Sequence, residues 1–377
     1  MNQFSLTDEQ KEFKHKVMDF VRTELESRSA EIDEKALYPW DIIKNFAEFG
    51  LLGLAIPKEY GGMGCSLFDT CLAIEQVAGV DVAAAMWVGV NIGGLLPLLN
   101  GGNEEQKRQY LPKIASGELI TGVAFTEPEA GSDLHSLRTS AERRSDHYVI
   151  NGRKCFISNA GVASVYSLLA RTDKGKEGIT GFILDADSPG LSVGKMESKM
   201  GVRGSHTGDL IFEDCIIPLN KRLGEEGGGT GLAMGMLNFT RPLIGAQSVG
   251  LASGVFEYTR EYAREHRTRL APSFEVIKYK LADMAIRVES ARALVYQTAF
   301  LSDSGHSDTG KFASMAKCFA SDVAMKICIE AMQIFGSRGY SSDYPIERWM
   351  RDAKILQIYE GTNQIQRVTI AKTLLGK

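Results

Sequence analysis

Apolar positions within residues 1–120 recur at the three- and four-residue spacing of a helix. Thr7 and Gln10 stand in a capping-box arrangement before one such run, which comprises Phe13, Val17, Phe20, Val21 and Leu25. A second helix is predicted from Asp41 to Phe49, because a glycine follows it. Ser66 and Asn103 predict the caps of further helices, so this part of the chain is predicted to be helical.

The stretch from Val82 to Asn103 contains no charged residue and is long enough to span a bilayer. Polar residues, glycines and a proline interrupt it, and no basic residues flank it. We therefore predict a buried helix followed by a turn, and no membrane span.

Short apolar runs replace the helical pattern after Gly117, and they predict strands. Asn151-Gly152 lies between two apolar triplets and predicts a β-hairpin. Strands at this spacing are typical of a barrel or sandwich of about 110 residues. The other strand candidates are Leu119–Phe125, Ser164–Ala170, Gly181–Leu184, Asp209–Phe212 and Cys215–Ile217.

Helical spacing returns from Gly229 and persists to the end, which predicts an up-and-down bundle. Helices, then strands, then helices, without βαβ alternation, indicate an α+β chain. The predicted domains are residues 1–120, 121–228 and 229–377. Two long apolar stripes carry the bundle prediction, one from Leu281 to Val295 and one from Phe312 to Ile327.

Composition excludes several classes of protein. The net charge is −4, without the basic footprint of a nucleic-acid-binding protein. The 6 cysteines form no CxxC pair, so we predict no metal site and free thiols. The polar N-terminus lacks a secretory signal, which favours a cytoplasmic location. The chain has 39 glycines, yet the richest run, residues 224–231, lacks the phosphate-binding motifs and is interpreted as a flexible linker.

Two segments of the predicted strand region carry candidate chemistry. In the first, Thr126 and Ser132 can donate hydrogen bonds to an anion, and Gly131 lets the backbone approach it; an ordinary turn explains the segment equally well. In the second, Phe156 and Ser158 stand two apart on a strand and would share one face. They could bind a planar ring, although an ordinary core position is the favoured interpretation of Phe156.

A third segment, residues 333–366, contains a carboxylate beside a glycine and a tyrosine. A glutamate held in a partly apolar pocket has a raised pKa and can act as a general base. Glu360 is the candidate, and Gly361 would admit a substrate against the backbone. The alternative is an ordinary surface residue at a helix end.

Taken together, the three segments resemble the signatures of the acyl-CoA dehydrogenase family over essentially the whole chain. The matching signatures read TEPEAGSD from Thr126, QIFGSRGY to ERWMRDAK from Gln333, and IYEGTNQIQ from Ile358. The resemblance implies an N-terminal helical domain, a middle β-barrel and a C-terminal four-helix bundle. It also implies FAD, an acyl-CoA or acyl-carrier-protein thioester as substrate, electron-transferring flavoprotein as acceptor, and a homotetramer or dimer.

The resemblance also implies roles for individual residues. Glu360 would remove the α-proton of the thioester while the β-hydrogen leaves as hydride to flavin N5, and the backbone N–H of Glu360 would bind the thioester carbonyl. Some members carry the base at the position of Thr240, so Glu360 is the candidate here. The implied FAD contacts are Phe125, Thr126, Ser132, Phe156, Ser158, Thr362 and Gln364, with Gln333 and Gly336 reaching the FAD of a partner subunit. The implied substrate contacts are Ser132, Asn238, Arg241, Tyr359 and Gly361.

One stretch departs from the family pattern. Residues 265–272 lack the Phe and Gly of an expected Arg-x-x-Phe-Gly element, although Arg267 or Arg269 could still bind a pyrophosphate. Ser337 also replaces a usual glycine. These departures leave two alternatives open beside the dehydrogenase: a flavin oxidase or monooxygenase on the same scaffold, and a non-catalytic relative without FAD.

Overall fold

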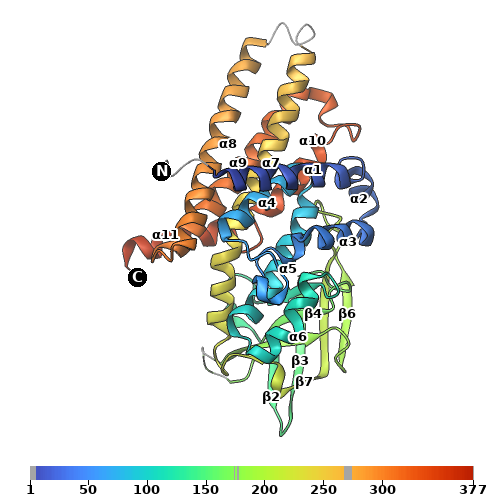
Figure 1. Cartoon of the computed structure of the whole chain (residues 1–377), viewed down its shortest axis with the longest axis vertical. Helices are drawn as coiled ribbons and strands as arrows, with labels where there is room; N and C mark the ends of the chain where they lie inside the picture. Colours follow the sequence, from blue (N-terminus) through green and yellow to red (C-terminus); the bar gives the residue numbers. More distant parts are fainter. Residues whose placement is uncertain (1–5, 174, 176–177, 267–273, 377) are drawn as a thin grey trace.

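A helical region, a sheet and a second helical region follow one another along the chain (Figure 1), as the sequence predicts. The computed structural model describes residues 6–173, 175, 178–266 and 274–376. The first region comprises α1 (Asp8–Leu25), α2 (Ser29–Lys35), α3 (Trp40–Phe49), α4 (Leu67–Val80), α5 (Val82–Gly101) and α6 (Glu104–Ala115).

Predicted caps fix the ends of these first helices. Thr7 and Gln10 form the capping box of α1, and Asn103 does the same for α6. The Ser66 side chain accepts a hydrogen bond from the N–H of Asp69 at the start of α4. After α3, Gly50 adopts a φ of 96°, a left-handed conformation that ends the helix.

Helix α5 is the predicted uncharged helix, and it lies mostly inside the protein. Asp81 caps its start, with a side chain that accepts from the N–H of Ala84, and the helix continues through Pro97 to Gly101. Within the described residues it is the one helix whose length and composition would suit a membrane span. Its burial against α4 and α7 explains the apolar composition.

The described residues of the middle region form one sheet of eight strands, hydrogen-bonded in the order β6-β7-β3-β2-β4-β5-β8, with β1 pairing in parallel with β4. Strands β2, β6 and β8 escaped the sequence prediction because they are short or largely exposed. The strands are β1 (Thr121–Ala124), β2 (Ser140–Arg143), β3 (His147–Ser158), β4 (Val165–Arg171), β5 (Ile179–Asp185), β6 (Leu191–Met196), β7 (Thr207–Pro218) and β8 (Arg222–Leu223).

The hairpin predicted at Asn151-Gly152 is wrong, because β3 passes straight through it. The register with β7 shifts between Ile150 and Gly152, which marks a β-bulge. Gly152 has a φ of 149°, and a Cβ there would lie 2.6 Å from the Thr139 hydroxyl. The glycine is therefore required for a bulge and a close contact, and the turn before β3 lies at residues 144–147, where the Arg144 N–H donates to the His147 carbonyl.

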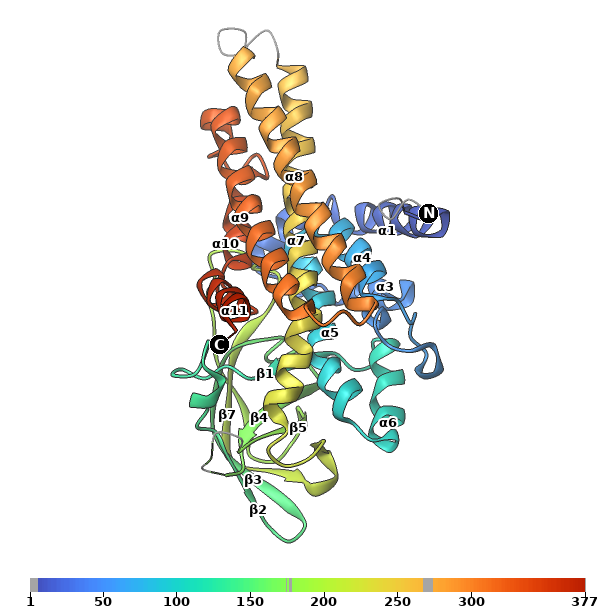
Figure 2. The same cartoon turned by 90° about the vertical axis from the view of Figure 1, so that its left-hand side faces the viewer.

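Three long helices form the core of the last region, and two shorter ones pack beside them (Figure 2). The predicted apolar stripes lie on α8 and α9. Helix α7 also packs against α4 and α5, so it joins the two helical regions. The helices are α7 (Gly229–Glu265), α8 (Phe274–Asp303), α9 (Thr309–Phe335), α10 (Ile346–Leu356) and α11 (Asn363–Leu375).

The glycine-rich stretch before α7 is a hydrogen-bonded turn rather than the predicted flexible linker. The N–H of Gly227 donates to the Thr180 hydroxyl at 3.0 Å. The Glu226 carboxylate accepts from the Tyr148 hydroxyl and from Arg143. These contacts fix the start of α7 to the sheet.

Candidate active site

The turn between α10 and α11 places Glu360 at the junction of the helices. Glu360 has a φ of 55° and Gly361 a φ of 93°, two consecutive left-handed residues. A left-handed glutamate is strained, so the surrounding contacts must hold it. Helix α11 then starts at once, because the Thr362 hydroxyl accepts from the N–H of Ile365 at 3.2 Å.

Side chains from three helices hold the two carbonyls of this turn. The Glu360 carbonyl accepts from Arg241 Nε at 3.3 Å and from Gln366 Nε2 at 3.0 Å. The Gly361 carbonyl accepts from Gln366 Nε2 at 3.0 Å and from Lys317 Nζ at 2.8 Å. A Cβ on Gly361 would lie 2.6 Å from that glutamine nitrogen, so a larger residue would disturb the arrangement.

The surroundings of the Glu360 carboxylate push its pKa in opposite directions. Burial raises the pKa, whereas the hydrogen bond from Thr240 and the charges of Arg241 and Lys317 lower it, and burial prevails. The Thr240 hydroxyl donates to Glu360 Oε2 at 2.7 Å. Such a carboxylate holds a proton more tightly than one in water, which suits a general base.

Lys317 is fully buried behind the turn and was not found from the sequence. Its ammonium also donates to Asn363 Oδ1 at 2.9 Å. Burial lowers the pKa of Lys317 to about 8. Its position inside the apolar stripe of α9 could have identified it from the sequence, since a buried lysine needs hydrogen-bonding partners.

Several polar atoms around the turn have no partner in the described part of the chain. Arg241 Nη1 and Gln366 Oε1 are buried and unpaired. The Glu360 N–H donates to no other group in the same part of the chain. Because buried polar groups are normally satisfied, these atoms point to a polar ligand at this position.

Phe125 and Thr126 follow β1 and are fixed by a buried ion pair. Lys154 Nζ donates to the Phe125 carbonyl at 3.0 Å and to Glu127 Oε1 at 2.7 Å. Burial lowers the pKa of Lys154 to about 8. Burial alone would raise the pKa of Glu127, but Lys154 and neighbouring hydrogen bonds outweigh it and hold that pKa below its usual value.

Phe156 is not the core residue that the sequence favoured. It is 63% exposed and has a φ of 54°, where the register of β3 shifts between Lys154 and Ile157. This irregularity turns the ring outward, so the simple alternation assumed for Phe156 and Ser158 does not hold. An exposed ring near the half-buried Thr126 and Ser158 fits a planar group such as the isoalloxazine of FAD.

The remaining predicted residues lie apart from these contacts. Asn238 is half-buried beside Gly310, and Arg267 lies outside the described residues. The others are exposed and make no hydrogen bond to the Glu360 turn in the described part of the chain: Ser132, Gln333, Gly336 and Gln364. No group of three or more metal-binding side chains occurs among the described residues.

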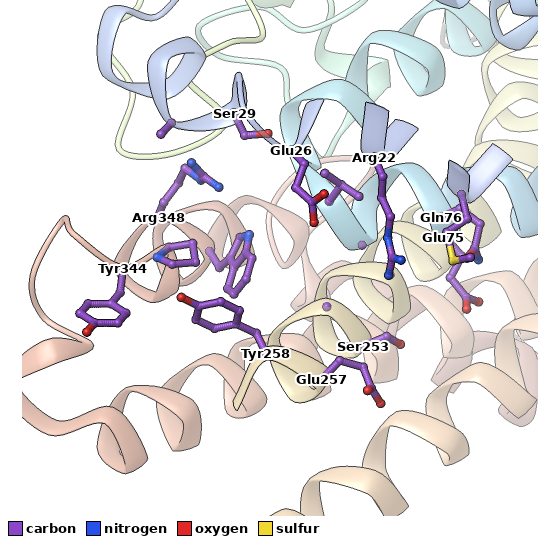
Figure 3. Close-up of a pocket in the computed structure, with 18 of the residues that line it drawn as sticks. Arg22, Glu26, Ser29, Glu75, Gln76, Ser253, Glu257, Tyr258, Tyr344 and Arg348 are labelled. Carbon is purple, nitrogen blue, oxygen red and sulfur yellow. The ribbon is translucent and has the colours of Figure 1, made fainter. Parts of the chain in front are cut away.

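A cavity of about 770 Å³ lies away from Glu360, between the N-terminal helices, α7 and the start of α10 (Figure 3). Glu75, Tyr258 and Arg348 line it. A second cavity of about 560 Å³ shares Arg348 with it. Neither is lined by Glu360, Phe156 or Arg241, so neither defines this site.

Family models match nearly the whole chain. The N-terminal, middle and C-terminal domains of acyl-CoA dehydrogenase match residues 7–118, 122–215 and 227–375. An acyl-CoA dehydrogenase of Bacillus subtilis is 44% identical, covering 98% of this chain and 99% of the relative. Butyryl-CoA dehydrogenase of Megasphaera elsdenii has a similar structure, with a TM-score of 0.95, 38% identity and 99% coverage of both chains. The FAD complex of PigA matches with a TM-score of 0.93, 26% identity and 98% coverage of both chains.

Proposed function

Because the chain belongs to the acyl-CoA dehydrogenase family, oxidoreductases that act on CH–CH bonds, we propose that it oxidises an acyl thioester to the trans-2-enoyl thioester with bound FAD. One observation carries the proposal. The Glu360 carboxylate accepts a hydrogen bond from the Thr240 hydroxyl, and burial raises its pKa. Its strained turn is held by Arg241 and Lys317, which donate to the turn's carbonyls.

Glu360 would take the α-proton of the thioester on its carboxylate. This proton is acidic only while the carbonyl is polarised, so the carbonyl oxygen needs donors. The Glu360 N–H, which donates to no other group in the described part of the chain, would supply one at the residue that carries the base. Arg241, Tyr359 and Gly361 would shape the substrate side of the turn. Bound FAD would supply the acceptor for the hydride that leaves the β-carbon.

The cofactor would contact residues from two parts of the chain. Phe125, Thr126, Phe156 and Ser158 would bind the ring, which the exposed face of Phe156 supports. Ser132, Thr362 and Gln364 would bind the rest of the dinucleotide. Gln333, Gly336 and Arg267 would contact the FAD of a partner subunit in a homotetramer or dimer. The domains would be divided after residues 120 and 228.

Anaerobic mixing of the purified protein with acyl thioesters tests the proposal. The expected result is a loss of the absorbance of oxidised flavin. Comparison of acyl-CoA with acyl-carrier-protein substrates identifies the carrier that the protein accepts. We also propose electron-transferring flavoprotein as the acceptor. A colourless protein that takes up no FAD would contradict the proposal, and rapid reoxidation in air would favour an oxidase.

Replacing Thr240 with valine should change the pH dependence of flavin reduction. The hydroxyl lowers the pKa of Glu360, so its loss raises that pKa further. Because the base acts as a carboxylate, the acidic limb of the rate profile should move to higher pH. We expect about tenfold slower reduction at neutral pH, since a hydrogen bond to a charged group is lost, with recovery at alkaline pH.

Thr240→Ser keeps the hydroxyl and is the matched control for this experiment. Its profile should resemble that of the unchanged protein. An equal loss for Thr240→Val at every pH would mean that Thr240 does not act through the charge of Glu360.

A further inference from the structure

The loop between β6 and β7 packs on two consecutive residues of α10. The Val202 N–H donates to Asp352 Oδ1 at 2.5 Å. The Met200 carbonyl accepts from Arg351 Nη1 at 2.9 Å. A Cβ on Gly201 would lie 2.5 Å from the Arg351 carbonyl oxygen, so this contact leaves no room for a side chain. Three consecutive residues of the β6–β7 loop thus lie directly against α10.

The surroundings hold both sides of this contact in place. Val202 has a φ of 45°, a left-handed conformation that is unusual for a β-branched residue. Such a conformation persists only where neighbouring contacts hold the backbone, and the Asp352 side chain that binds it is buried. Arg351 is fixed in turn by two hydrogen bonds to Asp33, at 2.5 Å and 3.1 Å, and by Glu347.

The charge of Asp352 makes this contact costly to maintain. Burial and the charges of Asp81 and Asp33 raise the pKa of Asp352 to about 7. The hydrogen bond from Val202 and the charge of Arg348 lower the pKa but do not prevail. Strongly shifted groups are concentrated at functional sites, which favours a role for this carboxyl group beyond packing.

On its sheet side, the β6–β7 loop leads into the strand that pairs with the proposed flavin contacts. The carbonyl of His206, the last residue of the loop, accepts from the Asn159 N–H at 2.8 Å. Thr207 begins β7 and pairs with Ser158 of β3. Ser158 and Phe156 are two of the residues that would bind the flavin ring. A shift of the loop would therefore move the strand ends that hold the ring.

On its helix side, the contact is joined to Glu360 through backbone hydrogen bonds. The helical path continues past the end of α10, because the N–H groups of Ile358 and Tyr359 donate to the Ile355 carbonyl at 2.8 Å and 3.2 Å. Glu360 follows directly. A displacement of Asp352 would therefore move the turn that carries the carboxylate.

We infer that Asp352 is a positioning residue that fixes the distance between the flavin-binding strands and Glu360. This inference rests on the proposed function. The base and the flavin act on neighbouring carbons of one thioester, so their separation must match the substrate. Asp352 would act through the β6–β7 loop and α10, without touching the reacting atoms. A misplacement of about 1 Å that originates far from the chemistry can lower a rate about 10²-fold.

Asp352→Leu tests the inference, because leucine has a similar volume and cannot accept from the Val202 N–H. We would reduce the flavin of the holoenzyme anaerobically with butyryl-CoA and octanoyl-CoA. The limiting rate per bound flavin should fall about 10²-fold, whereas KM should change little, since the defect lies in the transition state rather than in binding. Dithionite, which reduces flavin without a base, should reduce the variant and the unchanged protein equally.

Asp352→Asn is the conservative variant. Its amide oxygen can still accept from the Val202 N–H, so it should reduce flavin at least about tenfold faster than Asp352→Leu. This recovery depends on the hydrogen bond to the β6–β7 loop and not on the charge of the carboxylate.

Gly201→Ala is an independent second variant, which leaves Asp352 intact if the leucine variant does not fold. Gly201 does not have a left-handed φ, so the added methyl acts by pushing the loop away from α10. The limiting rate should again fall while KM is kept. Gly231→Ala is the matched control, because a Cβ there meets nothing within 4 Å, and its rate should be unchanged.

The two variants that disturb the contact decide the inference together. An unchanged limiting rate per bound flavin in Asp352→Leu and Gly201→Ala, with only the melting temperature or the flavin content lowered, would overturn it. Failure of both thioesters to reduce the flavin of the unchanged protein would instead contradict the proposed function.

Discussion

Glu360→Gln should abolish flavin reduction by acyl thioesters while leaving the protein folded and able to bind FAD and substrate. Glutamine matches glutamate in shape, and its amide oxygen can still accept from Thr240. It cannot take up a proton at neutral pH. A positioned general base contributes about 10²- to 10⁴-fold, so we expect a rate at least about 10²-fold lower in anaerobic stopped-flow measurements.

Glu48→Gln makes the same exchange on the exposed side of α3, where the carboxylate pairs only with Lys44 among the described residues. This variant should reduce flavin at an almost unchanged rate, because exposed pairs contribute little. Product binding by Glu360→Gln, followed as a shift of the flavin spectrum, separates a chemical defect from a folding defect. Full α,β-dehydrogenation by Glu360→Gln would remove Glu360 from the role of base.

Features set by neighbouring residues could be predicted from the sequence. The capping boxes at Thr7 and Asn103 and the stop at Gly50 depend on contacts within a few positions. Apolar stripes at helical spacing located α8 and α9 for the same reason. Local chemistry and the observed structure agree in these places because no distant contact competes with them.

Features set by distant contacts were missed or misjudged. Asn-Gly favours a positive φ, and both a tight turn and a bulge require one, so the dipeptide at Asn151 could not distinguish them. The close contact between Gly152 and Thr139 favours the bulge. Phe156 was misjudged for the same reason, because alternation along a strand holds only while the register is kept.

The buried lysines show this limit within the site itself. Lys154 binds Glu127 and the Phe125 carbonyl, which lie 27 and 29 positions earlier in the chain. Lys317 binds the Gly361 carbonyl 44 positions later. Their positions in apolar runs indicate burial, but only the fold identifies their partners.

Lys154→Met should destabilise the protein strongly and weaken FAD binding. The change leaves Glu127 as a buried carboxylate without its cation, and breaking such a pair costs about 3–5 kcal/mol. It also removes the donor to the Phe125 carbonyl, so the segment that would contact FAD loses an anchor. Urea unfolding measures the loss of stability, and the flavin content after dialysis measures FAD retention.

Lys195→Met is the control within the same sheet, because the side chain of Lys195, which pairs with Glu197, is 68% exposed. We expect its free energy of unfolding to change by less than about 1 kcal/mol. A double variant, Lys154→Met with Glu127→Gln, should regain part of the stability, since it removes the isolated charge and keeps one acceptor oxygen for the N–H group of Arg138 or Thr139. If the double variant were no more stable than Lys154→Met, the loss would come from packing of the lysine stem rather than from the uncompensated carboxylate.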